Sequence, residues 1–286
     1  MGGSLLDLAY QVYPAGPAVR SPIVLLHALG SCADDWQLQL PALAGRWPTL
    51  AVDLRGHGDS PSASGWYGMT DIAADVAALL DRSAIGPGHV VGLSLGAAAG
   101  LQLAVDRPDL VLSLVLVNGF AGLRLGWRGA AGGAVRLALL LAGRMDWLGR
   151  WVAATVFPHP GQAQLRRLAA NRIGRMQRAD YLRTLWALAR FDVHDQLGQV
   201  SVPTLVVAAL QDRTVPFDAK RRLASGLPWA EWAVLPGSGH ASPIDAPDAF
   251  NALLTAFLLR QRSASPDGGR LFESKGPLPG ESGRRA

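Results

Sequence analysis

The chain has 286 residues, of which 49% are hydrophobic and only 17% are charged, so it has ample apolar material for one large folded core. The formal net charge of +5 could favour nucleic acid or an anionic partner, but no nucleic-acid-binding motif accompanies it, and we expect no nucleic-acid partner. Cys32 is the only cysteine, which excludes an intramolecular disulfide and a zinc site built from cysteines.

The N-terminus, MGGSLLDLAYQVY, has no basic segment followed by an apolar run and a cleavage site, so nothing in it resembles a secretory signal. The longest apolar stretches, at residues 110–117 and 134–143, are much shorter than the roughly 20 residues that cross a bilayer. Together with the single cysteine, these features predict a cytoplasmic protein without a transmembrane segment.

Short apolar runs alternate with helical patterns along most of the chain, which is typical of an α/β fold with a mostly parallel sheet. After an N-terminal strand near residues 5–12, we expect strands at residues 23–27, 49–53, 89–93, 111–118, 204–209 and 233–235. Apolar residues at three- and four-residue spacing predict helices at residues 34–44, 70–83, 95–106, 218–225 and 247–260. The sequence therefore predicts a central sheet flanked by helices.

Between residues 118 and 202 this alternation stops, and patterns of leucine, tryptophan and arginine predict several helices without strands. Arginines outnumber acids there, so most of the positive charge of the chain belongs to this segment. From residue 263 the chain is rich in Ser, Gly, Pro and charge, which predicts disorder. We expect a core at residues 1–119 and 199–262, a helical insertion at 120–198 and a disordered tail at 263–286.

The most specific local pattern is GLSLG at residues 92–96, between an apolar run and a helical start. A serine hydroxyl is a weak nucleophile, so a catalytic serine must be held at a fixed point beside a base. A sharp strand-to-helix turn does this, and the glycines that flank the serine relieve crowding in it. Ser94 is therefore a candidate nucleophile, although the pentapeptide alone fits a structural turn equally well.

The same motif requires an acid and then a histidine, each after a later strand. Asp212 follows the strand expected at residues 204–209, and His240 follows the strand expected at 233–235. We assign His240 as the general base and Asp212 as the acid that orients its imidazole and stabilises the protonated form.

With these segments in this order, the chain resembles the α/β-hydrolase superfamily, in its esterase and lactonase branch, from about residue 23 to residue 257. Other matching segments are HALG at residues 27–30, DLRGHGDS at 53–60 and VP at 215–216. The resemblance implies an α/β-hydrolase fold in which residues 120–198 form a helical cap. It also implies that the backbone N–H groups of Leu29 and Leu95 form the oxyanion hole. Ala28 departs from the glycine that is commoner at its position.

Some relatives carry the acid after the preceding strand, where this chain has Asn118, which cannot supply a negative charge; Asp212 is therefore favoured. A serine at position 94, in the strand-to-helix turn, disfavours dehalogenase and epoxide-hydrolase chemistry, which needs an aspartate at that position. We expect His27 and His57 to shape loops, and Asp245 with Asp248 to start a helix.

The resemblance implies hydrolysis of a small-molecule carboxylic ester or lactone through an acyl-enzyme on Ser94, and an anionic substrate would suit the basic cap. We expect no cofactor or metal, because neither a phosphate-binding loop nor metal-ligand spacing is present. One alternative is carbon–carbon bond hydrolysis, and another is cofactor-free perhydrolysis or acyl transfer by the same triad. A third, from another class, is a ligand receptor or signalling protein of the same fold with little or no catalysis. The sequence indicates no oligomeric state.

Overall fold

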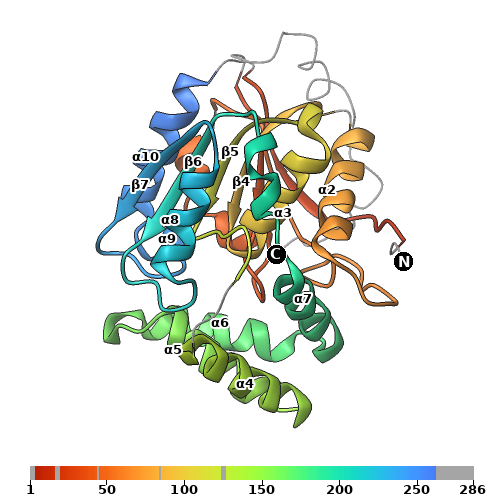
Figure 1. The fold of residues 1–286 in the computed structure, drawn as a ribbon, viewed down its shortest axis with the longest axis vertical. Helices are drawn as coiled ribbons and strands as arrows, with labels where there is room; N and C mark the ends of the chain where they lie inside the picture. Colours follow the sequence, from red (N-terminus) through yellow and green to blue (C-terminus); the bar gives the residue numbers. More distant parts are fainter. Residues whose placement is uncertain (1–3, 17–19, 44, 84, 124–126, 262–286) are drawn as a thin grey trace, which may run out of the picture.

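The computed structural model describes residues 4–16, 20–43, 45–83, 85–123 and 127–261. The tail expected at residues 263–286 lies outside the described residues. A seven-stranded sheet in the order β1-β3-β2-β4-β5-β6-β7 forms the centre, and its strands pair in parallel except for the antiparallel pair of β1 and β3. The predicted α/β fold with a mostly parallel sheet is confirmed (Figure 1).

The strands lie close to the positions expected from the apolar runs. They are β1 (Tyr10–Tyr13), β2 (Ile23–Leu26), β3 (Thr49–Val52), β4 (Gly88–Leu93), β5 (Val111–Val117), β6 (Thr204–Ala209) and β7 (Ala230–Leu235). Strands β2 to β6 are almost wholly buried, as expected for parallel strands covered on both faces. Strand β7 starts earlier than predicted because it is an edge strand, and the exposed Glu231 and Trp232 in it give no continuous apolar pattern.

Most of the core helices also agree with the periodicity, and they are α2 (Met69–Ser83), α3 (Leu95–Asp106), α8 (Phe217–Gly226) and α10 (Pro247–Arg260). The single helix expected at residues 34–44 is wrong. A 3₁₀ helix η1 (Ala33–Trp36) and one turn of α-helix, α1 (Leu40–Leu43), take its place, and Ala44 lies outside the described residues. Pro41 cannot donate a backbone hydrogen bond and restricts the residue before it, so one continuous helix cannot run through it.

Side chains of each strand alternate between the two faces of the sheet, so both faces carry an apolar core. On one face, Val24 and Leu26 pack with residues of α2, α3 and α8. On the other face, Ile23 and Leu25 pack with residues of η1, α1 and α10. Two helical layers therefore enclose the sheet, and the loops at the carboxyl ends of its strands are left to carry a site.

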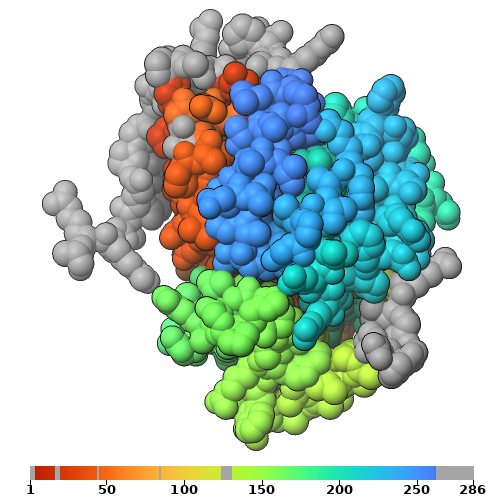
Figure 2. All heavy atoms as spheres, turned by 90° about the vertical axis from the view of Figure 1, so that its left-hand side faces the viewer, coloured from red at the N-terminus to blue at the C-terminus, as the bar shows by residue number. Residues whose placement is uncertain are grey.

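Between β5 and β6 the chain forms the expected helical segment. Its helices are α4 (Trp127–Leu141), α5 (Met145–Val156), α6 (Ala163–Arg175) and α7 (Arg178–Arg190), with short 3₁₀ turns at Pro160–Gln162 and His194–Gln199. These helices gather at one end of the sheet (Figure 1) and cover that end of the molecule in the turned view (Figure 2). They have an apolar cluster of their own, which contains Leu140, Leu148, Val152, Ile173 and Tyr181.

Within the part of the chain that the structure describes, no helix combines the length and the apolar character needed to span a membrane.

Candidate active site

Ser94 lies in the sharp turn between β4 and α3, where its backbone has φ 53°. This is an uncommon conformation for a residue with a side chain, and it is maintained only where the surroundings enforce it. The Ser94 N–H donates to the carbonyl of Val117 at 3.0 Å, and the Ser94 carbonyl accepts from Ala98 at 3.0 Å. The turn is therefore fixed by β5 on one side and by helix α3 on the other.

The two glycines of the motif are required by close approach of the backbone. A Cβ atom at Gly92 would lie 2.2 Å from the Gly96 carbonyl oxygen. A Cβ atom at Gly96 would lie 2.0 Å from the carbonyl oxygen of Leu26 in β2. Both separations are far inside van der Waals contact, so only glycine allows helix α3 to begin this close to the sheet.

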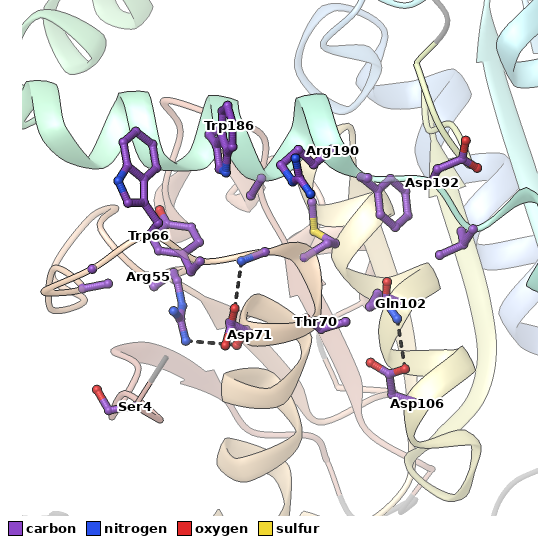
Figure 3. Close-up of a pocket in the computed structure, with 18 of the residues that line it drawn as sticks. Ser4, Arg55, Trp66, Thr70, Asp71, Gln102, Asp106, Trp186, Arg190 and Asp192 are labelled. Carbon is purple, nitrogen blue, oxygen red and sulfur yellow. Dashed lines mark hydrogen bonds between the residues drawn. The ribbon is translucent and has the colours of Figure 1, made fainter. Parts of the chain in front are cut away.

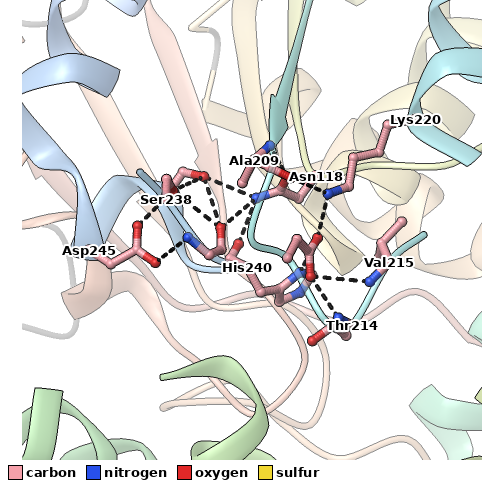
Figure 4. A network of polar contacts seen from close by, with 11 residues as sticks. Asn118, Ala209, Thr214, Val215, Lys220, Ser238, His240 and Asp245 are labelled. Atoms are coloured by element: carbon pink, nitrogen blue, oxygen red, sulfur yellow. Dashed lines mark hydrogen bonds and ion pairs between the residues drawn. The ribbon is translucent and has the colours of Figure 1, made fainter. Parts of the chain in front are cut away.

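Asp212 and His240 are joined directly, as the sequence predicts. His240 Nδ1 donates a hydrogen bond to Asp212 Oδ2 at 3.0 Å, and Oδ1 of the same carboxylate accepts the backbone N–H groups of Thr214 (2.7 Å) and Val215 (3.2 Å) (Figure 4). This arrangement fixes the orientation of the carboxylate and leaves Nε2 as the nitrogen of His240 that is free for a second partner.

The electrostatic surroundings keep Asp212 ionised. Burial alone would raise the pKa of its carboxyl group, but the charge and hydrogen bond of His240, followed by those of Lys220, outweigh burial and hold that pKa well below its usual value. An ionised Asp212 beside His240 favours the protonated imidazole that a general base becomes when it takes a proton.

Ser94 is at the same edge of the sheet, because β4, β5, β6 and β7 are parallel neighbours and the candidate residues follow β4, β6 and β7. The structure brings Asp212 and His240 into contact, whereas the hydrogen bonds of the described residues include none from Ser94 to His240. Catalytic hydrogen bonds are often long or poorly aligned without substrate and tighten when substrate binds, so a nucleophile and its base need not be bonded here.

The two proposed oxyanion donors also end at this edge. Leu95 is the first residue of α3, so its N–H has no acceptor within the helix. Leu29 follows β2, the neighbour of β4, and the loop turns at Gly30 with φ 77°. Ser31 N–H donates to the Ala28 carbonyl at 3.1 Å and closes this turn. Ala28 therefore does not prevent the tight turn that places Leu29.

His27 and His57 have structural contacts. His27 Nδ1 donates to the carbonyl of Ala28 (2.8 Å), and its Nε2 accepts from the N–H of Leu54 (2.9 Å). His57 Nδ1 donates to the Arg55 carbonyl (2.9 Å), and the two imidazoles are 5.0 Å apart. Burial lowers the pKa of His27 to about 4 and that of His57 to about 3. Both rings are therefore neutral supports for the neighbouring loops.

Three residues have a part in the site that sequence reasoning did not assign. Asn118 was rejected as an acid, but its buried side chain donates from Nδ2 to the carbonyl of His240 (2.8 Å) and accepts at Oδ1 from Ala209 (2.8 Å). Lys220 of α8 forms a buried ion pair with Asp212 at 2.7 Å. Sequence reasoning missed Lys220 because a lysine on an amphipathic helix is usually exposed, and nothing in its local pattern indicates a buried partner.

Asp245 is the third, and its expected role is wrong. It ends the short helix α9 (Ser242–Asp245) and does not start one, whereas Asp248 lies in the first turn of α10 as predicted. Asp245 accepts hydrogen bonds from Ser238 Oγ (2.7 Å) and from Gly239 N–H (2.9 Å). Its carboxylate therefore holds the loop directly before His240.

The helical segment packs against the loop that contains Leu29. Ile173 of α6 is so near Gly30 that a Cβ atom there would lie 2.6 Å from its side chain. Arg172, next to it on α6, forms an ion pair with Asp35 of η1. Leu29 packs against both the core cluster and the apolar cluster of the helical segment. The helical segment, which we call the cap, therefore touches the proposed oxyanion donor itself.

A cavity of about 940 Å³ lies at another junction of cap and core, and Figure 3 shows its lining. Trp66, from the loop before α2, and Trp186 of α7 face each other there with ring centroids 5.5 Å apart. Arg190 lies over the Trp186 ring at 5.3 Å. Ser94, Asp212 and His240 are not part of this lining, so the cavity is separate from the candidate site.

Among the described residues, no three His, Cys, Asp or Glu side chains are grouped so that they could hold a metal ion.

Comparison with known proteins agrees with the fold. A family model described as alpha/beta hydrolase fold matches residues 21–247. A protein of Variovorax paradoxus (strain S110) named "Putative carbamate hydrolase RutD" is 37% identical over 266 residues, and the match covers 89% of this chain and 97% of that protein. A protein of the same name from Azorhizobium caulinodans is 31% identical over 270 residues, with 89% and 96% covered.

Two solved structures resemble the whole molecule. A hydrolase from Pseudomonas aeruginosa PA01 has a TM-score of 0.80 and 28% identity, and the match covers 88% of this chain and 94% of that one. The enol-lactonase from Burkholderia xenovorans LB400 has a TM-score of 0.80 and 25% identity, with 89% and 97% covered.

Proposed function

The chain belongs to the α/β-hydrolase fold family, and we propose that it is a serine hydrolase that cleaves a carboxylic ester or a lactone through an acyl-enzyme on Ser94. One observation carries the proposal, namely the hydrogen bond from His240 Nδ1 to Asp212 Oδ2 at 3.0 Å. If Ser94 only shaped the turn, no oriented imidazole would be needed at the same edge of the sheet.

In the proposed reaction, Ser94 Oγ attacks the carbonyl carbon of the substrate while His240 Nε2 takes the hydroxyl proton. The negative charge that develops on the carbonyl oxygen is bound by the N–H groups of Leu29 and Leu95. His240 then gives its proton to the leaving alcohol, and the acyl group stays on Ser94. Water, activated by the same imidazole, attacks the acyl-enzyme and releases the acid.

A carbamate is the second candidate, because the relatives named above are carbamate hydrolases by name. The carbonyl of a carbamate ester can be attacked by the same serine, which would leave a carbamoyl group on Ser94. The nitrogen lone pair of a carbamoyl group makes its carbonyl carbon less reactive toward water. Hydrolysis of the carbamoyl-enzyme therefore becomes the slow step. The two candidates therefore differ in how fast Ser94 is regenerated.

The cap supports a neutral rather than an anionic substrate. Several cap arginines already have partners: Arg172 pairs with Asp35, Arg183 pairs with Asp180 at 3.3 Å, and Arg166 donates to the carbonyls of Phe157 (3.0 Å) and His159 (2.6 Å). The side chains that pack beside Leu29 belong to the apolar cap cluster. We therefore propose a small, largely apolar acyl group.

Reaction with a fluorophosphonate probe, followed by turnover of p-nitrophenyl acetate, butyrate and a p-nitrophenyl carbamate, tests the proposal. We expect one equivalent of probe on Ser94 in the folded protein, no labelling of Ser94→Ala, and unchanged labelling of the exposed control Ser64→Ala. Failure to label Ser94 would contradict the proposed hydrolase function, and labelling without turnover of any ester, lactone or carbamate would favour a receptor.

The cytoplasmic location stays a prediction, supported by Cys32 as the only cysteine.

A further inference from the structure

Lys220 has an unusual place for a lysine. The chain contains two lysines, Lys220 and Lys275, among many arginines. The Lys220 side chain is 0% exposed, and burial of an ammonium group is costly unless it is paired and hydrogen-bonded. Its contacts are Asp212 Oδ2 at 2.7 Å and the carbonyl of Ala209 at 3.1 Å, both shown in Figure 4. The ammonium group is therefore directed at the proposed catalytic acid.

The contact has the length expected for a charge-assisted hydrogen bond between an ammonium group and a carboxylate. Burial lowers the pKa of Lys220, and the charge and hydrogen bond of Asp212 oppose this shift. Each partner thus keeps the other in its charged form in a place from which water is excluded.

Lys220 and His240 share one oxygen. Asp212 Oδ2 accepts from Lys220 Nζ at 2.7 Å and from His240 Nδ1 at 3.0 Å, whereas Oδ1 is occupied by two backbone amides. The negative charge that would stabilise a protonated His240 is therefore partly compensated by a cation on the same atom. A positive charge this close disfavours a second positive charge on the imidazole.

Several other charged groups near this pair have their own partners. On α8, Asp218 and Arg221 pair with each other at 3.0 Å on the surface. Asp245 of α9 is bonded to Ser238 and Gly239, and His159 of the cap bonds through Nε2 to Gln211 Oε1 at 2.8 Å. Lys220 is thus the charge that faces Asp212 from α8.

We propose that Lys220 is a positioning residue of the site: it clamps the Asp212 carboxylate and lowers the basicity of His240. This inference rests on the proposed function. Its benefit follows from the reaction, since His240 then remains a neutral, proton-accepting base to lower pH. A merely structural Lys220 would stabilise the end of β6 without any effect on the titration of His240.

The first test is the pH dependence of kcat/KM for p-nitrophenyl acetate in Lys220→Met, Lys220→Gln and the wild type. Both variants remove the charge, and the glutamine keeps a hydrogen-bond donor. We expect the acid limb to move to higher pH in both variants, because a like charge disfavours the protonated imidazole and its removal takes this effect away. Arg221→Met, which removes an exposed charge from the next position of α8, should leave the profile in place. An unshifted acid limb in both variants, with reduced activity or stability, would overturn the proposal.

The second test needs no turnover and includes a measurement on the wild type. Labelling with ¹⁵N-lysine should give two side-chain signals, of which the one that persists in Lys275→Arg belongs to Lys220. We expect that signal to be an ammonium in slow exchange with water at neutral pH, and the imidazole pKa of His240 to rise in the variants. A Lys220 amine that is neutral or in fast exchange would overturn the proposal, even if the variants do not fold. If the wild type is not labelled by fluorophosphonate, the proposed function fails; if it is labelled and the titrations do not move, the role of Lys220 fails.

Discussion

Asn118 Nδ2 donates a hydrogen bond to the backbone carbonyl of His240 at 2.8 Å, and its Oδ1 accepts from the N–H of Ala209 at 2.8 Å. Asn118 is fully buried and has φ 47°, a conformation that asparagine tolerates better than most residues. One side chain therefore connects the ends of β5 and β6 to the loop of the proposed base.

We expect Asn118→Ala to lower the free energy of unfolding by about 2–6 kcal/mol, because two buried backbone groups lose their partner at about 1–3 kcal/mol each. Activity should also fall, since the His240 loop is freed. Urea denaturation and kcat/KM measure the two effects, and the exposed Asn171→Ala on α6 is the control. Equal stability of the two variants would contradict the role of Asn118.

Asp212→Asn should reduce kcat/KM by about 10⁴-fold, because an amide cannot stabilise the protonated His240 and favours the wrong tautomer. The matched control is Asp218→Asn, six positions along the chain in the first turn of α8, where the side chain is exposed. We expect its activity to stay within about 2-fold of the wild type. A loss of activity in both variants alike would show that charge in this region, and not the contact with His240, is what matters.

Gly96→Ala should destabilise the protein by at least about 2 kcal/mol, because its new Cβ would lie 2.0 Å from the backbone oxygen of Leu26, which cannot move aside. Gly237 has nothing within 4 Å of an added Cβ, so Gly237→Ala should change stability by no more than about 0.5 kcal/mol. Thermal denaturation of the two variants compares a crowded glycine with an open one, and similar melting temperatures would be inconsistent with the geometry of the turn.

The protein should lose stability between about pH 6.5 and pH 4. Burial lowers the pKa of His27 and His89 to about 4 and that of His57 to about 3, from the ordinary value of 6.5. Above pH 6.5 these histidines are neutral in both states and contribute no pH dependence; below it the unfolded chain binds protons that the folded chain does not. Each such proton contributes a slope of up to about 1.4 kcal/mol per pH unit.

Urea denaturation at a series of pH values measures this slope. His89→Asn should reduce it by about one proton, whereas His159→Gln, at an exposed position, should not. A slope that is the same in the wild type and His89→Asn would show that His89 is protonated in the folded state.

Arg172→Met and Asp35→Asn should each raise KM by about 3-fold, because they break the same ion pair between α6 and the segment after the oxyanion loop. The double variant should be no worse than either single one, as expected for two residues that act through one contact. The pair is partly exposed, with 35% and 27% of the two side chains accessible, so high salt should reduce the difference from the wild type. Additive effects on KM would mean that the two residues act separately.

Patterns that are local in the sequence predicted most of the fold. Continuous apolar runs located the buried strands, and the borders of β6, α3 and α10 agree with the prediction. The prediction of one helix at residues 34–44 was wrong because apolar residues at helical spacing continue across Pro41. The start of β7 was missed because an edge strand with Glu231 and Trp232 has no buried periodicity.

The candidate site was predicted as far as its residues lie in motifs. The contact between Asp212 and His240 follows from chain order and strand order, and it is present. The roles of Lys220, Asn118 and Asp245 depend on contacts across the fold, for example Asn118 with His240, 122 positions apart. A single sequence gives no signal for such pairs.

The formation of an acyl-enzyme on Ser94 is measured most directly by rapid acid quenching during turnover of p-nitrophenyl acetate, followed by mass spectrometry of the peptide that contains Ser94. We expect one acetyl group on Ser94 at early times, its disappearance as substrate is exhausted, and neither acetylation nor turnover in Ser94→Ala. Turnover by Ser94→Ala at the wild-type rate, or turnover by the wild type with Ser94 never acetylated, would contradict the proposed function.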